Sequence, residues 1–179
     1  TGEKAPVANP SCMKRRDFLV TAAILGCAPA WAAPRVARHQ LLHVSFQCSQ
    51  PLGKPVKVGV DAVSAKTGQF EVLVAEVGKE AFAQLKSASV DPFGYCKSTY
   101  LGISSPATRK STRKVAGAAR ESEVYPDSFP HKDYLEVLWL ERKEGAGVML
   151  AFRVAKSMNL NKASSVIDQV CSSLEWKLT

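Results

Sequence analysis

The chain has 179 residues, of which 46% are hydrophobic and 22% are charged. This length and composition fit one folded domain with a targeting segment, and they exclude an intrinsically disordered chain. The formal net charge is +8 at pH 7. This moderate basic excess favours anionic partners, but the chain lacks the dense basic and interleaved aromatic residues of a nucleic-acid binder.

The segment that begins at Met13 has the pattern of an export signal. It carries two adjacent arginines, a short apolar run that ends at Cys27, and an alanine-rich stretch up to Ala33. The apolar run is much shorter than the roughly 20 residues that a transmembrane helix needs. The order of positive charge, apolar run and small residues predicts a signal peptide rather than a buried helix.

The residues around the arginine pair resemble the twin-arginine (Tat) signal of exported bacterial proteins, in which two arginines precede a variable residue, Phe and Leu. Four residues match this pattern: Arg15, Arg16, Phe18 and Leu19. Val20 departs from it, because Lys is often found at that position. The resemblance implies export to the periplasm by a route that carries folded proteins, and it permits a cofactor without requiring one.

The processing of this signal decides which product is exported. Ala30 and Ala32 fit the small-x-small pattern that signal peptidase accepts, so we expect cleavage after Ala32 and a mature chain that begins at Ala33. A second interpretation is lipidation at Cys27, because a Gly before this Cys fits a lipoprotein signal. A lipidated product would be anchored to a membrane, whereas a cleaved product would be released.

These boundaries divide the chain into three parts. We take Met13 as the natural start, residues 1–12 as an upstream extension, residues 13–32 as the signal and residues 33–179 as a single domain. Residues 1–32 hold four basic and two acidic side chains. The domain therefore keeps 20 basic and 14 acidic side chains, a net charge of +6.

The first half of the domain predicts three strands and a helix. Apolar and polar residues alternate over 42–48 and 56–62, and residues 70–77 are rich in Val and Phe. These patterns are typical of strands, which we expect to form a meander. Apolar residues then recur at helical spacing over 79–89, and a further short strand is expected over 95–104.

Residues 105–130 are predicted to form an exposed basic connector with a short helix over 116–123. Its basic residues are our candidates for docking an anion: Arg109, Lys110, Arg113 and Lys114. A phospholipid headgroup, an acidic polymer or an acidic protein would each supply the opposite charge. The alternative is a solvated connector that binds nothing.

The last third of the chain predicts a hairpin followed by a helix. Strands over 134–142 and 148–155 flank a Gly-rich turn. Asn161 is expected to cap the closing helix. The apolar residues of this helix and its end share one face: Ala163, Val166, Ile167, Val170, Cys171 and Leu174. Trp176 follows as an expected core residue.

Together these elements predict an α+β fold, in which an antiparallel sheet carries a central helix and a packed C-terminal amphipathic helix. The order of hairpin, amphipathic helix and the terminal segment 174–178 resembles the Mog1/PsbP-like α/β/α sandwiches. The resemblance covers the last third of the chain, and it implies a fold rather than a functional site.

The domain holds three cysteines, and the oxidising periplasm permits a disulfide between two of them. Cys48 and Cys171 lie on apolar faces of a predicted strand and helix, whereas Cys96 lies near a turn. Cys48–Cys171 and Cys96–Cys171 are rival pairings, and three separate thiols are the alternative. The chain has no Cys-x-x-Cys pair, which argues against a thioredoxin-type redox role.

Candidate catalytic and metal-binding residues are few. His39 and His43 would lie roughly 13 Å apart along a strand, at about 3.3 Å per residue, which is too far for one metal ion. We therefore predict no metal site and no cofactor. Cys96, His131 and Asp133 would make a catalytic triad only if the fold joined them, and no nucleophile motif supports it.

The sequence thus favours a non-enzymatic periplasmic protein that binds an envelope protein or an anionic surface. An accessory or immunity-type protein of the cell envelope is one specific version. Contact with a membrane is expected only if Cys27 is lipidated, and binding of nucleic acid is not expected. The alternative is a small periplasmic enzyme that uses Cys96 or a carboxylate.

Overall fold

The computed structural model describes residues 36–128 and 133–177. These residues belong to one compact unit, Pro34–Thr179. His131 and the candidate residues of the export signal lie outside the described residues: Arg15, Arg16, Phe18, Leu19, Cys27, Ala30, Ala32 and Ala33. In the described part of the chain, no helix combines the length and the apolar character that crossing a membrane requires.

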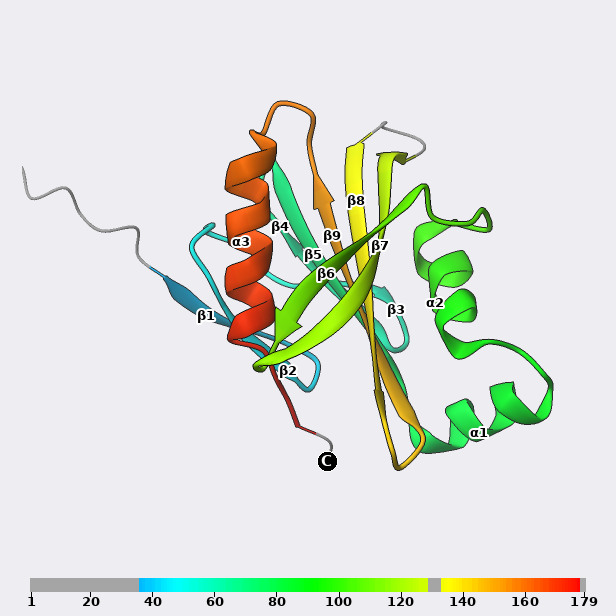
Figure 1. The fold of residues 1–179 in the computed structure, drawn as a ribbon. Helices are drawn as coiled ribbons and strands as arrows, with labels where there is room; N and C mark the ends of the chain where they lie inside the picture. Colours follow the sequence, from blue (N-terminus) through cyan, green and yellow to red (C-terminus); the bar gives the residue numbers. More distant parts are fainter. Residues whose placement is uncertain (1–35, 129–132, 178–179) are drawn as a thin grey trace, which may run out of the picture. The chain divides into compact units, whose positions relative to one another are not determined.

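Seven antiparallel strands form the main sheet, in the order β3-β4-β5-β9-β8-β7-β6 (Figure 1). Their bounds are β3 (Val56–Gly59), β4 (Ala62–Lys66), β5 (Phe70–Val77), β9 (Ala146–Val154), β8 (Asp133–Arg142), β7 (Ala118–Ser128) and β6 (Arg109–Val115). A smaller sheet has the order β1-β2-β10, with bounds β1 (Ala37–Leu41), β2 (Val44–Cys48) and β10 (Glu175–Trp176).

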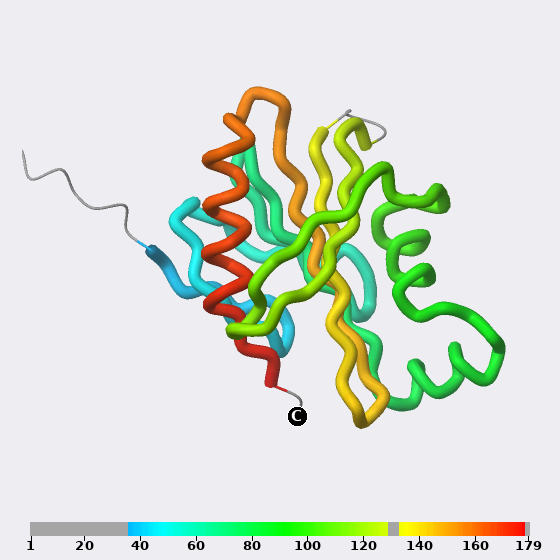
Figure 2. Tube along the Cα trace, in the orientation of Figure 1, coloured from blue at the N-terminus to red at the C-terminus, as the bar shows by residue number. Residues whose placement is uncertain are grey.

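Three helices cover the two faces of the main sheet: α1 (Lys79–Ser87), α2 (Pro92–Leu101) and α3 (Leu160–Ser172). Figures 1 and 2 show α3 on one side of the sheet, and α1 and α2 on the other. The predicted α+β class, with an antiparallel sheet and a packed C-terminal helix, is therefore confirmed.

Two apolar clusters, one on each face of the main sheet, form the core. In β5, Val72 and Val74 belong to the cluster that contains α3, while Leu73 and Ala75 belong to the cluster that contains α1 and α2. A strand covered on both faces needs apolar side chains at nearly every position. This requirement explains why the central strands are continuous apolar runs.

Helix α3 is the main cover of the first cluster. The predicted apolar stripe is confirmed, because every member is buried: Ala163, Val166, Ile167, Val170, Cys171 and Leu174. The cap is Asn159 rather than Asn161: its Oδ1 atom accepts hydrogen bonds from the backbone N–H groups of Asn161 at 2.9 Å and Lys162 at 3.3 Å. Trp176 is only partly buried, with the Arg142 guanidinium 4.4 Å from its ring centroid.

The predicted connector over 105–130 is wrong. Most of it forms β6 and β7, a hairpin at the edge of the main sheet, and the helix expected over 116–123 falls largely in β7. The charged residues that suggested a loop pair across the two strands, as Lys110 Nζ and Glu121 Oε1 do at 2.6 Å. Inward-facing residues such as Val115 are buried, so the hairpin contributes to the core.

Two further expectations are corrected. The segment 95–104 is mainly part of helix α2, because the Asp91 carboxylate caps that helix by accepting from the N–H groups of Phe93 at 3.3 Å and Gly94 at 2.8 Å. The expected meander starts one strand later. Strand β2 pairs with β1 and β10 in the small sheet, and the meander consists of β3, β4 and β5.

Among the described residues, the three cysteines are buried free thiols, so neither candidate disulfide is formed and the alternative of three separate thiols holds. Cys48 and Cys171 belong to the cluster that contains α3, whereas Cys96 belongs to the opposite cluster. The main sheet therefore separates Cys96 from the other two, which rules out the Cys96–Cys171 pairing. Burial raises the pKa of the Cys96 and Cys171 thiols to about 12.

Candidate functional site

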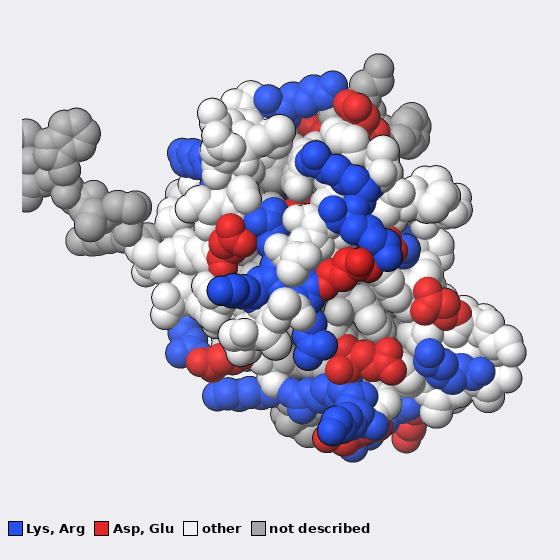
Figure 3. Space-filling view, in the orientation of Figure 1, with Lys and Arg blue, Asp and Glu red and all other residues white. Residues whose placement is uncertain are grey.

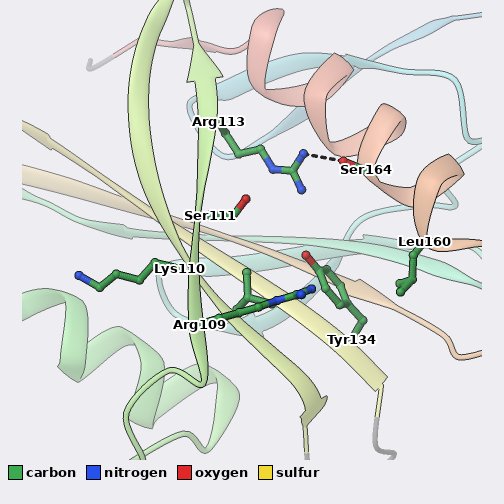
Figure 4. A pocket seen from close by; sticks show the side chains of 8 residues that line it. Arg109, Lys110, Ser111, Arg113, Tyr134, Leu160 and Ser164 are labelled. Atoms are coloured by element: carbon green, nitrogen blue, oxygen red, sulfur yellow. Dashed lines mark hydrogen bonds between the residues drawn. The ribbon is translucent and has the colours of Figure 1, made fainter.

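A groove runs between strand β6 and helix α3. Its first part is a cavity of about 280 Å³, and Figure 4 shows the side chains that line it: Arg109, Lys110, Ser111, Arg113, Val124, Tyr134, Leu160 and Ser164. An adjoining cavity of about 340 Å³ shares Arg109, Tyr134 and Leu160 with the first. It adds four residues: Pro126, Ala155, Lys156 and Met158. We call the two cavities together the β6–α3 groove.

The alternation of side chains along strand β6 places the four basic residues that were predicted to dock an anion on two opposite faces. Successive side chains of a strand point to opposite faces, so Arg109 and Arg113 share the face toward α3, while Lys110 and Lys114 share the other. Figure 4 shows Lys110 turned away from the other labelled side chains. The predicted cluster is therefore not one site. The side chains of Arg109 and Arg113 point toward the groove, whereas Lys110 lines the first cavity with its side chain turned away.

Arg113 forms the base of the groove and is almost completely buried. Its Nε and Nη2 atoms donate to the two carboxylate oxygens of Glu136 at 2.7 and 2.6 Å, in the bidentate geometry that favours strong charge-assisted hydrogen bonds. Glu136, which is fully buried, also accepts hydrogen bonds from Ser122 Oγ at 2.6 Å and from the Tyr134 hydroxyl at 2.8 Å. The buried charges are thus paired and extensively hydrogen-bonded.

The remaining guanidinium nitrogen ties Arg113 to helix α3. Its Nη1 atom donates to Ser164 Oγ at 2.8 Å and to Asp168 Oδ1 at 3.0 Å. Together with Glu136, these contacts join β6, β8 and α3 in one network. Such a network holds both walls of the groove in a defined arrangement.

The network keeps its charges at neutral pH. Burial acts to raise the pKa of Glu136, but the hydrogen bonds from Arg113, Ser122 and Tyr134 outweigh it and hold the pKa below its usual value. The hydrogen bonds to Glu136 in turn raise the pKa of Arg113. Burial, followed by the nearby Glu136 charge, raises the pKa of Tyr134. Arg113 is therefore a structural cation whose charge is already matched.

Arg109 differs from the other basic residues of the groove. Its side chain is exposed, and its Cζ atom lies 5.9 Å from the centroid of the Tyr134 ring. Lys110, Arg113 and Lys156 each form an ion pair with a carboxylate, whereas no carboxylate among the described residues forms one with Arg109. Arg109 is thus the groove cation whose charge the described residues leave unmatched.

The groove is apolar on the side of Arg109 that faces the start of α3. Leu160, the first residue of this helix, is 56% exposed although it is large and hydrophobic. Met158 and Tyr134 extend the apolar surface into the second cavity. Apolar walls with a small number of placed polar groups are typical of ligand sites.

The residues of the alternative catalytic hypothesis do not form a site in the described structure. Cys96 is completely buried, and the raised pKa of its thiol is the opposite of the activation that a nucleophile needs. Asp133 begins β8, and His131 lies outside the described residues. The fully buried carboxylate, Glu136, is held ionised by Arg113.

The two histidines that were considered as metal ligands lie in different parts of the structure. His39 lies in β1, and His43 lies in the turn before β2, with its Nδ1 atom 2.7 Å from Glu76 Oε2. Within residues 36–128 and 133–177, no group of three or more His, Cys, Asp and Glu side chains is arranged to hold a metal ion.

Sequence reasoning missed most residues of the groove and its base, and among them are Tyr134, Glu136, Leu160 and Ser164. Glu136 does have a signal, because it interrupts the apolar run of strand β8, and a carboxylate in a strand covered on both faces needs a buried partner. The other three carry no such signal. The packing of α3 beside β6 brings Leu160 and Ser164 to the groove, and the position of β8 in the sheet brings Tyr134 there.

The chain matches no protein-family model and no curated protein. A crystal structure from Bacteroides thetaiotaomicron aligns with a TM-score of 0.45 and 11% identity, over 76% of this chain and 46% of the other. This chain thus spans less than half the length of that protein. The solution structure of cyanobacterial PsbP (CyanoP) from Synechocystis sp. PCC 6803 aligns with a TM-score of 0.47 and 13% identity, over 86% of this chain and 99% of the other. Both likenesses are weak and concern the fold alone.

Proposed function

We propose that this chain is an exported, non-enzymatic binding protein of the bacterial cell envelope, and that it holds an anionic ligand or partner in the β6–α3 groove. The observation that carries this proposal is Arg109. It is an exposed cation with no ion-paired carboxylate among the described residues, and it lines both cavities of a groove whose size suits a ligand.

The network at the base of the groove favours binding. A preformed groove loses little conformational freedom when a ligand enters, so less of the interaction energy is spent on ordering the protein. Arg113 supplies this rigidity, because it connects Glu136 on β8 with Ser164 and Asp168 on α3.

The electrostatics of the network argue against acid–base catalysis. A general acid or base works best when its pKa lies near the operating pH. In the groove, the pKa of Glu136 is lowered and the pKa values of Arg113 and Tyr134 are raised, so each group is shifted away from neutrality. These groups are suited to hold a fixed charge pattern rather than to transfer protons.

The location in the envelope is supported by the twin-arginine pattern at Arg15 and Arg16. The net charge of +6 on residues 33–179, from 20 basic and 14 acidic side chains, favours an anionic component of the envelope. An accessory or immunity-type role, in which the protein occupies an envelope protein, is the specific version that we retain.

A photo-crosslinking amino acid at Leu160 tests whether the groove engages a partner in the periplasm. We expect a discrete crosslinked product, and we expect Arg109→Glu to reduce it several-fold, because a reversed charge repels an anionic partner. The same photo-crosslinking residue at Val60, which is 88% exposed and does not line the groove, is the control. An identical product from both positions, or one that Arg109→Glu leaves unchanged, would contradict the proposal.

Export itself is expected to fail when Arg15 and Arg16 are both changed to Lys. The signal is expected to depend on two guanidinium groups, and Lys does not reproduce their planar, multiply donating geometry. Fractionation of a tagged precursor measures the effect, and Lys14→Gln, which lowers the charge but keeps the pair, is the control. Periplasmic protein at the wild-type level in the double variant would refute the export route. The intact mass of exported protein then separates a chain that begins at Ala33 from one lipidated at Cys27.

A further inference from the structure

The two cavities of the β6–α3 groove differ in chemistry. The first is lined mainly by polar and basic side chains, including Arg109, Ser111 and Ser164. The second adds mostly apolar ones, including Met158 and Pro126. Because the cavities share residues, one ligand can extend from the polar part into the apolar part.

We propose that the groove binds an amphiphilic anion with one negative charge, placing its carboxylate or phosphodiester group at Arg109 and its hydrocarbon tail along Leu160 toward Met158. This inference rests on the proposed function, and it names the chemical class of the ligand. The volumes of about 280 and 340 Å³ suit a short acyl chain with a compact head.

The charges around the first cavity favour a head group that carries a single negative charge. Arg109 provides the unmatched positive charge, and its planar guanidinium can donate two hydrogen bonds to a carboxylate or phosphate. Arg113 cannot attract a second negative charge, since Glu136 and Asp168 already bind it. Asp168, whose side chain is 58% exposed, would repel a further anion.

The wider surface does not favour a polyanion either. Figure 3 shows that Lys and Arg side chains on this face are interspersed with Asp and Glu, so no continuous positive field covers it. Lys110 is paired with Glu121, and Lys156 Nζ lies 3.4 Å from Asp127 Oδ1. A long acidic polymer would meet these carboxylates, whereas one small head group at Arg109 would not.

The second cavity is better matched to hydrocarbon than to peptide. Four of its seven lining side chains, those of Pro126, Ala155, Met158 and Leu160, offer no strong hydrogen-bond donor or acceptor. The polar groups of the other three belong to Arg109, Tyr134 and Lys156. The amide groups of a buried peptide would lose their water without gaining partners from the four apolar side chains, which is costly. An alkyl chain has no polar groups to satisfy, and it would cover the exposed part of Leu160.

Isothermal titration calorimetry of residues 33–179 tests the proposal with three probes, each used at a concentration below that at which micelles form. The probes are n-octanoate, acetate, which lacks the tail, and 1-octanol, which lacks the charge. We expect octanoate to bind at least about tenfold more tightly than either, a difference of about 1.4 kcal/mol. The binding of dihexanoyl phosphatidylglycerol, which is anionic, is compared with that of the zwitterionic phosphatidylcholine. This comparison tests whether a lipid headgroup, rather than a free carboxylate, supplies the negative charge.

Two variants test whether octanoate binds in the groove. Arg109→Gln is expected to weaken octanoate at least about tenfold, and Leu160→Ser to weaken octanoate without affecting acetate. Lys54→Gln, an exposed lysine that does not line the groove, is the control for loss of one charge. Circular dichroism on heating verifies that each variant is folded.

The outcomes separate this inference from the proposed function. Octanoate binding that survives Arg109→Gln, equal binding of octanoate and acetate, or tighter binding of an acidic peptide than of octanoate would overturn the amphiphile. If no amphiphile binds while the crosslink at Leu160 still depends on Arg109, the ligand class is wrong and the binding function stands. If both fail, the groove is not the functional site.

Discussion

Replacing Glu136 with Leu is expected to lower the free energy of unfolding by about 3–5 kcal/mol, because the variant leaves the Arg113 guanidinium buried without its main partner. Glu136 is completely buried and holds Arg113 through two hydrogen bonds of 2.6 and 2.7 Å. Urea denaturation at pH 7 measures the change. Glu121→Leu, which breaks the exposed pair with Lys110, is the matched control and should have little effect.

The double variant Arg113→Leu with Glu136→Leu separates charge from packing. Removal of both buried charges avoids an unpaired ion, so the double variant should recover most of the stability that Glu136→Leu loses. Recovery would show that the loss in the single variant comes from the unpaired Arg113. A double variant as unstable as the single one would instead assign the loss to altered packing.

The same pair predicts a pH dependence. The folded-state pKa of Glu136 lies below its usual value, so its contribution to stability is present above the unfolded-state pKa of about 4.3. The contribution is lost as the pH falls through the folded-state pKa. The stability advantage of the wild type over the Glu136→Leu variant should therefore shrink as the pH falls below about 4, which urea denaturation over a pH series measures.

Replacing Ile167 with Ala is expected to cost about 2–5 kcal/mol, since the substitution leaves a cavity under helix α3 as well as removing apolar contact. Ile167 is completely buried in the cluster between α3 and the sheet. A loss of this size is a large part of the roughly 5–15 kcal/mol that stabilises a typical domain. Chemical denaturation is the measurement.

Ser165→Ala is the control for Ile167→Ala, because Ser165 lies on the exposed face of the same helix. It should change the unfolding free energy by less than about 0.5 kcal/mol. Equal stability of the two variants would mean that α3 is not packed as part of the core. The wall of the groove formed by Leu160 and Ser164 would then be lost as well.

Local sequence patterns were sufficient to predict those elements that follow a single hydrophobic periodicity. The stripe from Ala163 to Leu174 recurs at helical spacing, and it predicted the buried face of α3 because that spacing alone places its residues together. The β8–β9 hairpin was predicted for a similar reason, since its two apolar runs flank a Gly-containing turn. The α+β class follows from these elements.

The hairpin of β6 and β7 at the edge of the main sheet depends on pairing between two segments. The sequence of either segment alone does not show that pairing. Residues 109–123 have the composition of a solvated loop, yet β6 and β7 form a hairpin in which Lys110 pairs with Glu121. The cap of α2 at Asp91 was missed because the residues Asp-Pro-Phe-Gly also suit a turn. In both cases the local sequence permits two structures, and contacts with the rest of the domain select one.

For the candidate site, the sequence by itself determined that a basic segment exists, and the tertiary structure decided what each of its residues does. Strand formation turned Arg109 and Arg113 toward α3 and Lys110 away from it. Burial beside Glu136 then made Arg113 a structural ion, while Arg109 kept an unmatched charge at the groove. The physical reason is that the availability of a charge depends on its neighbours in space, and these come from β8 and α3, 23 to 55 residues further along the chain.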